Sequence, residues 1–155
     1  VDELYSEGLN KKDVAEYLAK LKADSFIEVG KDQLIITADT IVLVEGKILG
    51  KPKNKNEAFR MLSSLSNKSH DVITGVCIKT NNKSTSFSTS TKVFFKALSS
   101  AEIEYYIDTY KPFDKAGSYG IQEWIGYVAV EKIEGSYFNV MGLPIQQLYE
   151  ELKKY

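Results

Sequence analysis

The sequence predicts a single α/β domain in which helices are interleaved with β-hairpins. Apolar residues recur at helical spacing in four segments, and β-branched or aromatic residues gather in the segments between them. The expected strands do not form a regular strand–helix–strand repeat. We therefore expect a mixed sheet flanked by helices.

Four amphipathic helices are expected because four segments follow the i, i+3, i+4, i+7 pattern of one buried face. Asn54 and Ser99 each stand three positions before a glutamate, which is the spacing of a capping box. Pro144 suits the first turn of the last helix. The apolar positions that define the helices span residues 14–21, 58–65, 103–110 and 145–152.

Strands are expected where β-branched and aromatic residues gather or alternate with polar ones. Residues 45–47 have the composition of a turn between two strands, and Asn81-Asn82 is the expected turn of a longer hairpin. Two weaker candidates lie in the last third of the chain. The expected strands span residues 34–36, 41–44, 48–49, 72–78, 87–95, 127–133 and 137–140.

Size and composition indicate one globular domain, residues 1–155, and argue against several classes of protein. The chain is 43% apolar and 26% charged, and it is long enough to bury a core. A net charge of -1 argues against nucleic acid as a partner. The single cysteine, Cys77, cannot form an internal disulfide, and no apolar run is long enough for a membrane span. We therefore expect a cytoplasmic protein.

Residues 113–122 (Phe-Asp-Lys-Ala-Gly-Ser-Tyr-Gly-Ile-Gln) depart from any helical or strand pattern. The segment combines two glycines with charged and amide side chains, which disfavours both regular structures. Taken alone, it would be a tight surface loop. Three polar groups that interrupt apolar runs upstream indicate instead one wall of a pocket for a phosphorylated substrate.

Asp39 is the first of these groups, because it lies inside the apolar run of residues 35–42. An ionised carboxylate is costly to bury unless a cation or hydrogen-bond donors receive it. One interpretation is a bulge or strand end that turns Asp39 towards water. The other is a carboxylate at the mouth of a sheet that binds a divalent metal or activates water.

Lys22 and Lys51 form the second group. Lys22 stands eight positions after Val14, on the helix face that should meet the core, where a lysine can also lie along apolar surface. Lys51 follows a glycine just before a helix, which suits an anion but is also ordinary turn chemistry. Because Arg60 is the only arginine, a phosphate site in this chain must use lysines and backbone amides.

The third group is the segment 69–75, where the only histidine, His70, enters an expected strand between the hydroxyls of Ser69 and Thr74. A zinc site is not expected, because the chain has no second histidine and the cysteine has no partner. A carboxylate, lysines, hydroxyls and a glycine-rich loop that ends in an amide together favour phosphoryl or nucleotidyl hydrolysis assisted by a hard metal ion.

Five motifs, in their order and spacing, resemble the Maf family of nucleoside triphosphate pyrophosphatases. The resemblance covers essentially the whole chain, and Lys22-Ala23 is similar to a further Lys-Ala element of that family. It implies an elongated mixed sheet with two lobes around a cleft, as in inosine triphosphatases. The motifs are Ala38-Asp39-Thr40, Gly50-Lys51-Pro52, and residues 69–75, 114–122 and 139–144.

The resemblance implies hydrolysis of a nucleoside triphosphate to the monophosphate and pyrophosphate, with Mg²⁺, Mn²⁺ or Co²⁺. Asp39 would accept a proton and bind the metal, and Lys22 and Lys51 would hold the triphosphate charge. Glu3 resembles the acidic residue that completes the metal site, although its neighbour Asp2 is an alternative. The further substrate-binding candidates in the matching motifs are Thr40, Ser69, His70, Thr74, Lys115 and Gln122.

The ending Tyr-Gly-Ile-Gln of the 114–122 motif is similar to the branch of the family that acts on dTTP and UTP. The amide of Gln122 offers a donor and an acceptor, which suit the O4/N3 edge of thymine or uracil. The first alternative is a 7-methyl-GTP pyrophosphatase, and the second is a non-catalytic nucleotide-binding or septum-associated protein. The resemblance also implies a homodimer.

The chain departs from the family at its start. Members begin with a strand and a Ser-x-Ser-x-Arg-Arg loop that binds phosphates, and nothing similar precedes Val1. Either that segment lies outside this numbering or the chain is truncated. In the second case we expect weak turnover, because charge-assisted donors to the phosphates are lost.

Overall fold

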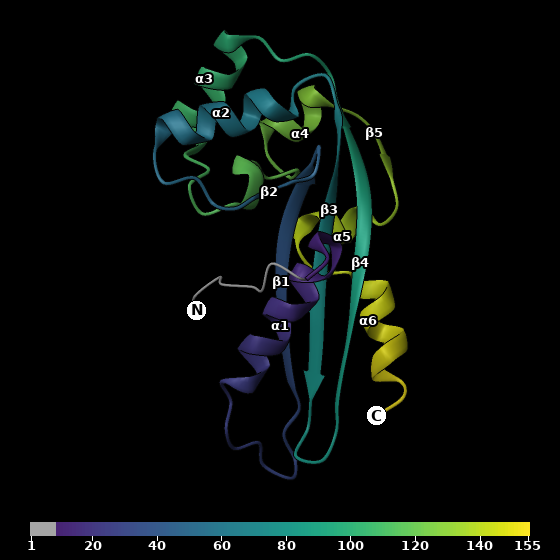
Figure 1. Cartoon of the computed structure of the whole chain (residues 1–155). Coiled ribbons are helices and arrows are strands. Elements are labelled where there is room, and N and C mark those ends of the chain that lie inside the picture. Colours follow the sequence, from purple (N-terminus) through teal and green to yellow (C-terminus); the bar gives the residue numbers. More distant parts are fainter. Residues whose placement is uncertain (1–8) are drawn as a thin grey trace.

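The computed structural model describes residues 9–155, which form a long five-stranded sheet with helices on both faces (Figure 1). The strand order is β2-β1-β3-β4-β5, and each pairing in it is antiparallel. The expected α/β fold, a sheet flanked by helices, is confirmed. The strands are β1 (Ile35–Val44), β2 (Lys47–Leu49), β3 (Ser69–Lys79), β4 (Ser84–Phe95) and β5 (Val130–Glu134).

The four expected amphipathic helices are confirmed as α1, α2, α3 and α6. At α3, Ser99 and Glu102 form a complete capping box. At α2, Asn54 accepts a hydrogen bond from the Glu57 amide, but the reciprocal bond is absent from the described contacts of this cap. The helices are η1 (Lys11–Asp13), α1 (Val14–Asp24), α2 (Lys55–Leu65), α3 (Ser100–Tyr110), η2 (Ala116–Ser118), α4 (Trp124–Ala129), α5 (Tyr137–Met141) and α6 (Ile145–Leu152).

At one end of the sheet, α1 and α6 cover opposite faces (Figure 1). Successive residues of a strand point to opposite faces, and β3 uses both of them. Ile73 packs in a cluster with α1, whereas Val76 and Ile78 pack against Leu148 of α6. The middle of β3 is therefore buried from both sides.

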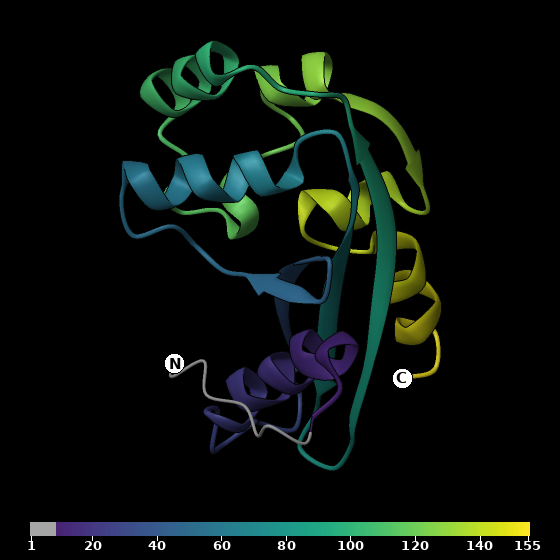
Figure 2. The ribbon, with the colours of Figure 1, turned by 45° about the horizontal axis from the view of Figure 1, so that its top comes forward.

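At the other end, α2, α3 and α4 lie together over the sheet (Figure 2). Their apolar faces meet β1, β3 and β4 in the largest core cluster, which includes the fully buried Tyr106, Leu62 and Phe95. Apart from α5, which lies near the middle of the sheet, the labelled helices thus fall into two groups at its two ends, which agrees with the expected two lobes (Figure 1). None of the helices in residues 9–155 is both long and apolar enough to cross a membrane.

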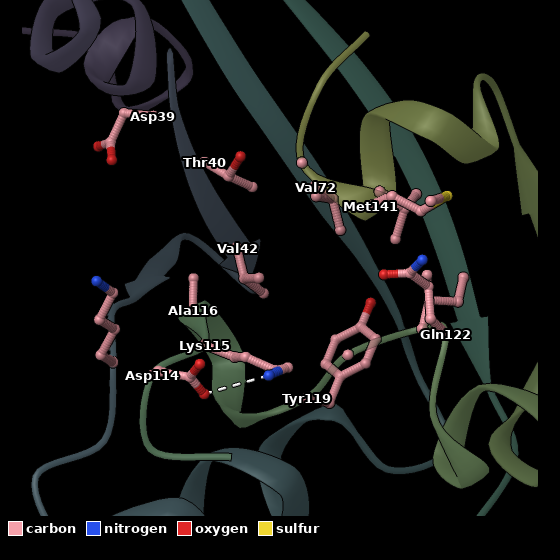
Figure 3. Close-up of a pocket in the computed structure, with 15 residues that line it drawn as sticks. Asp39, Thr40, Val42, Val72, Asp114, Lys115, Ala116, Tyr119, Gln122 and Met141 are labelled. Carbon is pink, nitrogen blue, oxygen red and sulfur yellow. Dashed lines mark hydrogen bonds and ion pairs between the residues drawn. The ribbon is translucent and has the colours of Figure 1, made fainter. Parts of the chain in front are cut away.

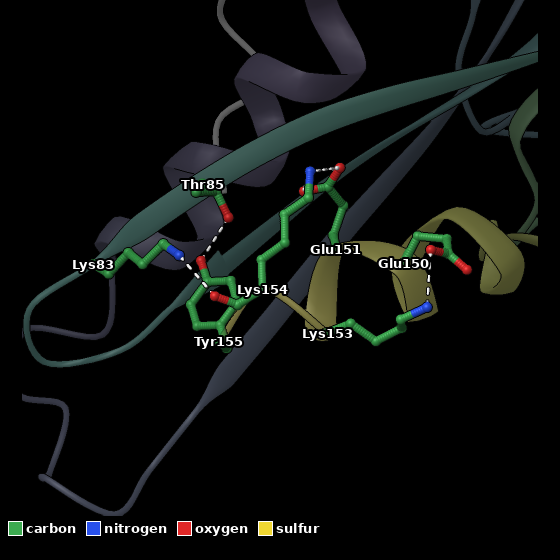
Figure 4. A network of polar contacts seen from close by, with 7 residues as sticks. All are labelled: Lys83, Thr85, Glu150, Glu151, Lys153, Lys154 and Tyr155. Carbon is green, nitrogen blue, oxygen red and sulfur yellow. Dashed lines mark hydrogen bonds and ion pairs between the residues drawn. The ribbon is translucent and has the colours of Figure 1, made fainter.

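The residues that follow α6 are hydrogen-bonded to the β3–β4 hairpin (Figure 4). The hydroxyl of Tyr155 donates to the carbonyl of Ile78 at 3.1 Å, and it also contacts the hydroxyl of Thr85. Lys83 donates to the carbonyl of Lys154 and lies over the Tyr155 ring. These contacts hold the last helix on its face of the sheet.

The expectation of separate strands on either side of Asp39 is wrong. β1 runs without interruption from Ile35 to Val44, and Asp39 is paired with Gly75 of β3. The carboxylate is tolerated because β2 pairs only with residues 42–44, so this part of β1 has β3 as its only strand partner within the described chain. An edge position gives a polar side chain access to solvent and cations.

The two weaker strand expectations are also corrected. Residues 127–129 belong to α4, and only Val130–Glu134 forms a strand. Residues 137–140 lie in the short helix α5, and Ser136 caps it by accepting a hydrogen bond from the backbone N–H of Asn139. The helix ends at Gly142, whose φ of 124° suits glycine.

Candidate active site

A pocket of about 280 Å³ opens beside the edge of β1 (Figure 3). Its walls come from β1, the segment after β2, the 114–122 loop and the C-terminal end of α5. Five of the predicted site residues line it: Asp39, Thr40, Lys51, Lys115 and Gln122. The fold thus brings together residues that are up to 83 positions apart in the sequence, from 39 to 122.

Asp39 and Lys22 form an ion pair at one side of the pocket. The Lys22 Nζ lies 2.9 Å from Asp39 Oδ1 and also donates to the carbonyl of Ala38 at 3.1 Å. Side-chain exposures of 37% for Lys22 and 20% for Asp39 leave both groups accessible to a ligand. An ammonium group has three N–H donors, so one donor of Lys22 remains for an anion.

Close docking of α1 on the sheet explains how Lys22 reaches Asp39. A Cβ atom on Gly75 would lie 2.2 Å from the backbone nitrogen of Glu16, so the helix sits directly on the backbone of β3. The hydroxyl of Thr37 also donates to the carbonyl of Ala19 at 2.7 Å. Lys22 follows Ala19 by three positions and therefore faces the same strand.

Thr40 and Thr74 are hydrogen-bonded to each other on the face of the sheet opposite to that of Asp39. Their hydroxyl oxygens are 2.9 Å apart, and the Thr74 hydroxyl donates to the carbonyl of Asn139 at 3.3 Å. Because a carbonyl can only accept, the proton of Thr74 is committed, and Thr40 is the donor between the two hydroxyls. The Thr40 oxygen can then accept a hydrogen bond from a ligand. Thr74 itself is fully buried beneath the pocket.

Asn139 anchors α5 at the rim of the pocket. Its buried side-chain amide donates to the carbonyls of Val72 at 3.0 Å and Thr89 at 3.1 Å. These bonds fix the helix to β3 and β4. They thereby place Met141 and Gly142, which line the pocket.

Lys51 and Lys115 supply positive charge from two segments that are tied together. The backbone N–H of Gly117 donates to the carbonyl of Gly50 at 3.0 Å, which joins the 114–122 loop to the segment carrying Lys51. Lys115 lies 3.2 Å from Asp114 and, by hydrogen bonding and charge, lowers the pKa of that carboxyl group. Lys51 lowers the same pKa more weakly, by its charge.

The loop makes a sharp turn before Tyr119. Gly117 has a φ of 72°, and a Cβ atom there would lie 2.9 Å from a methyl group of Val42. Ser118 is also left-handed, with a φ of 67°, and is fully buried. Only glycine adopts this backbone freely, so Gly117 allows the loop to pack closely on β1 and to direct Tyr119 into the pocket wall.

His70 lies beneath the pocket and contacts Tyr119. Its Nε2 is 2.6 Å from the Tyr119 hydroxyl, and its ring stands edge-on to Phe95 and Tyr119. Burial lowers the pKa of His70 to about 4, so the imidazole is neutral at pH 7. Four of the predicted site residues, Lys22, Ser69, His70 and Thr74, are absent from the described pocket lining, so their contact with a substrate stays a prediction.

Sequence reasoning missed several residues that shape the site. Asp114 and Tyr119 line the pocket, and Asn139 supports it, yet each was only part of a motif. Their place in the 114–122 loop was the one feature of the sequence that could have indicated Asp114 and Tyr119. Glu3 and its alternative Asp2, the expected acidic residues of the metal site, lie outside the described residues.

The carboxylates that line the pocket are of the ligand type that Mg²⁺ takes together with a phosphate. Within residues 9–155, no three His, Cys, Asp or Glu side chains form a cluster that could hold a metal unaided. Asp39 and Asp114 nevertheless both line the pocket. Mg²⁺ is usually bound by one or two carboxylates together with substrate phosphates and water. The residues present therefore suit such an ion.

Comparisons with known proteins find similarity to Maf-like proteins and to dTTP/UTP pyrophosphatases. The sequence model described as Maf-like protein matches residues 1–155. A dTTP/UTP pyrophosphatase of Porphyromonas gingivalis is 51% identical over 158 residues, which cover 100% of this chain and 79% of the relative. One of Christiangramia forsetii is 51% identical over 155 residues, 99% of this chain and 79% of the relative. One of Bacteroides fragilis is 55% identical over 155 residues, 99% of this chain and 80% of the relative.

Proposed function

Because this chain belongs to the Maf family, we propose that it is a nucleotide diphosphatase that hydrolyses dTTP and UTP to the monophosphate and pyrophosphate. The observation that carries the proposal is the composition of one pocket. Its lining contains Asp39, Lys51, Lys115 and the amide of Gln122, and Lys22 pairs with Asp39 from outside that lining. Figure 3 shows Asp39 and Gln122 at opposite sides of the pocket.

The triphosphate lies, in this proposal, against Lys51, Lys115 and the remaining donor of Lys22. Among the described residues no arginine lines the pocket, and lysines act as point charges, so several lysines together would hold the phosphates. The Gly50–Gly117 backbone bond supports this arrangement, because it holds the segments of Lys51 and Lys115 side by side.

Asp39 acts as the general base. It takes a proton from the water whose oxygen attacks a phosphorus of the α–β phosphoanhydride bond, and that bond breaks to release pyrophosphate. The hydrogen bond from Lys22 fixes the orientation of the carboxylate and leaves its other oxygen for the water. A correctly positioned base contributes about 10²–10⁴-fold to a rate.

A divalent ion, Mg²⁺ or else Mn²⁺ or Co²⁺, completes the proposal. Asp39 would hold it together with the substrate phosphates, and Glu3 is proposed as a second ligand. When bound, such an ion neutralises the charge that develops on the phosphate oxygens. The Asp39 carboxylate in the pocket lining supports this assignment, because Mg²⁺ is usually bound by one or two carboxylates together with substrate phosphates.

Gln122 and Thr40 select the base. The Gln122 side chain is exposed in the pocket, and its amide has both a donor and an acceptor for the O4/N3 edge of a pyrimidine. The Thr40 oxygen is available as an acceptor because its proton is used by Thr74. The names of the relatives, dTTP/UTP pyrophosphatase, support this choice of bases.

A homodimer and a cytoplasmic location belong to the same proposal. Large apolar side chains are exposed on the adjacent helices α5 and α6, which suits a protein interface. The buried free thiol of Cys77 and a nucleotide substrate are both in keeping with a reducing compartment. The exposed side chains are Tyr137, Phe138, Met141, Ile145 and Tyr149.

A pyrophosphate-release screen with Mg²⁺ tests the function. We expect dTTP and UTP to be turned over well above 7-methyl-GTP, and a chelator to stop the reaction. Replacing Gln122 by Glu (Gln122→Glu) removes the amide donor and should change the ratio of dTTP to 7-methyl-GTP turnover. A preference for 7-methyl-GTP, or nucleotide binding without any turnover, would support the alternative functions and overturn the proposal.

A further inference from the structure

The segment that carries Gln122 is held by a buried tyrosine of α3. The Tyr106 hydroxyl donates to Glu123 Oε1 at 2.5 Å and accepts from the backbone N–H of Gly120 at 3.0 Å. Gly120 and Glu123 lie on either side of Gln122 in the sequence. One hydroxyl group therefore fixes both ends of the short segment that presents the amide to the pocket.

The hydrogen bond between Tyr106 and Glu123 keeps its direction across the physiological pH range. Burial raises the pKa of the tyrosine, and the hydrogen bond to Glu123 raises it further. The hydroxyl therefore keeps its proton and donates it towards the carboxylate. Hydrogen bonds to an ionised acceptor are roughly twice as strong as neutral ones.

Tyr106 is attached to a rigid support. It is fully buried in the main core cluster, and its ring stacks on Tyr110 at 5.2 Å. The helix begins with the Ser99–Glu102 capping box, and Lys96 adds an ion pair of 2.7 Å to that glutamate. A hydroxyl placed by such a helix has little freedom to move.

The supported segment is itself tightly packed. The Glu123 amide donates to the carbonyl of Gly120 at 3.0 Å, and a Cβ atom on Gly126 would lie 1.8 Å from the carbonyl oxygen of Ile121. The Trp124 ring also stands edge-on to the Tyr105 ring of α3, with centroids 4.8 Å apart. If the Tyr106 hydroxyl moved, Gln122 would therefore move with it, because the packed segment has little room to adjust.

We propose that Tyr106 is a specificity-determining positioning residue: its hydroxyl sets the position of Gln122 through Gly120 and Glu123, and thereby the preference for a pyrimidine base. Tyr106 is absent from the described lining of the pocket, so it acts on the base only through this segment. The inference rests on the proposed selection of the base by Gln122.

The decisive variant is Tyr106→Phe, which removes the hydroxyl and keeps the buried ring. We expect the ratio of kcat/KM for dTTP to that for 7-methyl-GTP to fall about tenfold, roughly 1.4 kcal/mol of discrimination. The loss should appear mainly as a higher KM for dTTP, because the groups around Asp39 are untouched. Tyr110→Phe is the matched control, since no described hydrogen bond links its hydroxyl to residues 120–123, and its ratio should not change.

Two variants of Glu123 keep the test decisive if Tyr106→Phe is poorly folded in a thermal unfolding measurement. Glu123→Gln retains an oxygen that accepts from Tyr106, and we expect its ratio to stay within about twofold of the parent, a small effect on this scale. Glu123→Ala removes the acceptor and should lower the ratio as Tyr106→Phe does. An unchanged ratio in whichever of Tyr106→Phe and Glu123→Ala is folded overturns the inference.

Gln122→Glu separates the failure of this inference from the failure of the proposed function. If Gln122→Glu changes the ratio but Tyr106→Phe and Glu123→Ala do not, Gln122 selects the base without help from Tyr106, and the positioning role is wrong. If Gln122→Glu leaves the ratio unchanged, selection of the base by Gln122 is wrong, and the positioning role falls with it.

Discussion

The ammonium group of Lys22 lies 2.9 Å from the carboxylate of Asp39 and reaches it from a helix that rests directly on the neighbouring strand. Asp39 lies in the part of β1 that has only one strand partner among the described residues. Its position explains why a carboxylate stands in a largely apolar strand, and it places the proposed base in the lining of a pocket with further lysines.

Asp39→Asn should abolish most of the activity. The amide cannot accept the proton of the attacking water, so we expect kcat to fall by about 10²–10⁴-fold. Pyrophosphate release under saturating dTTP measures the effect. Asp108→Asn is the matched control, because Asp108 is exposed on α3 and pairs only with Lys55 within the described contacts. Equal losses in the two variants would contradict a catalytic role for Asp39.

Lys22→Ala should lower kcat, because Asp39 loses the hydrogen bond that orients it and the phosphates lose one hydrogen-bond donor. We expect a loss of about tenfold or more, corresponding to one charge-assisted hydrogen bond. Lys20→Ala is the control on the same helix, since Lys20 is exposed and faces Glu16 at 3.7 Å. Steady-state kinetics on dTTP measures kcat for both variants. Equal losses of kcat in Lys22→Ala and Lys20→Ala would contradict the role proposed for Lys22.

Gly75→Ala should both destabilise the protein and reduce activity. The added methyl group would meet the backbone of α1 at 2.2 Å, so the helix must move away and take Lys22 with it. Overpacking of this kind costs about 1–3 kcal/mol or more. Urea unfolding measures the loss, with Gly50→Ala as the control because a Cβ atom there meets nothing within 4 Å. Unchanged stability in Gly75→Ala would mean that α1 does not pack on β3 as described.

The buried His70 should make the protein less stable in mild acid. Its pKa falls from an ordinary value of 6.5 to about 4 on folding, because burial disfavours the charged ring. Between these values the unfolded chain binds a proton that the folded protein does not, so stability falls as the pH is lowered through this window. The loss approaches roughly 3 kcal/mol at the low end.

Chemical unfolding at several pH values between 4 and 7 tests this effect. The carboxylates also titrate near the lower limit, so the informative quantity is the difference between the parent protein and His70→Phe. The free energy of unfolding of His70→Phe should change less with pH than that of the parent protein, even if the variant is less stable at pH 7. A parallel dependence in both proteins would show that His70 is not the group responsible.

The helices and the long hairpin could be predicted because their signals are local. Ser99 and Glu102 are three positions apart, and the alternation of β3 and β4 is visible along each strand. The short helix α5 could not be recognised, because what fixes it is a set of hydrogen bonds from Asn139 to strands 48 to 67 positions away. A run of five residues gives too weak a pattern to show this.

The candidate site was predicted unevenly for a similar reason. Asp39, Lys51 and Gln122 could be found because each interrupts a local pattern or belongs to a motif. The expected role of His70 in substrate binding could not be judged without knowing that Tyr119 covers it. The contact of Tyr106 with Glu123 joins a helix to a loop 17 positions later, and neither residue departs from its local pattern.

Product analysis of dTTP hydrolysis tests the central claim most directly. Chromatography of the reaction with Mg²⁺ should show dTMP and pyrophosphate in equal amounts, and Asp39→Asn should form neither at a comparable rate. Formation of dTDP and inorganic phosphate, or an unchanged rate in Asp39→Asn, would contradict the account.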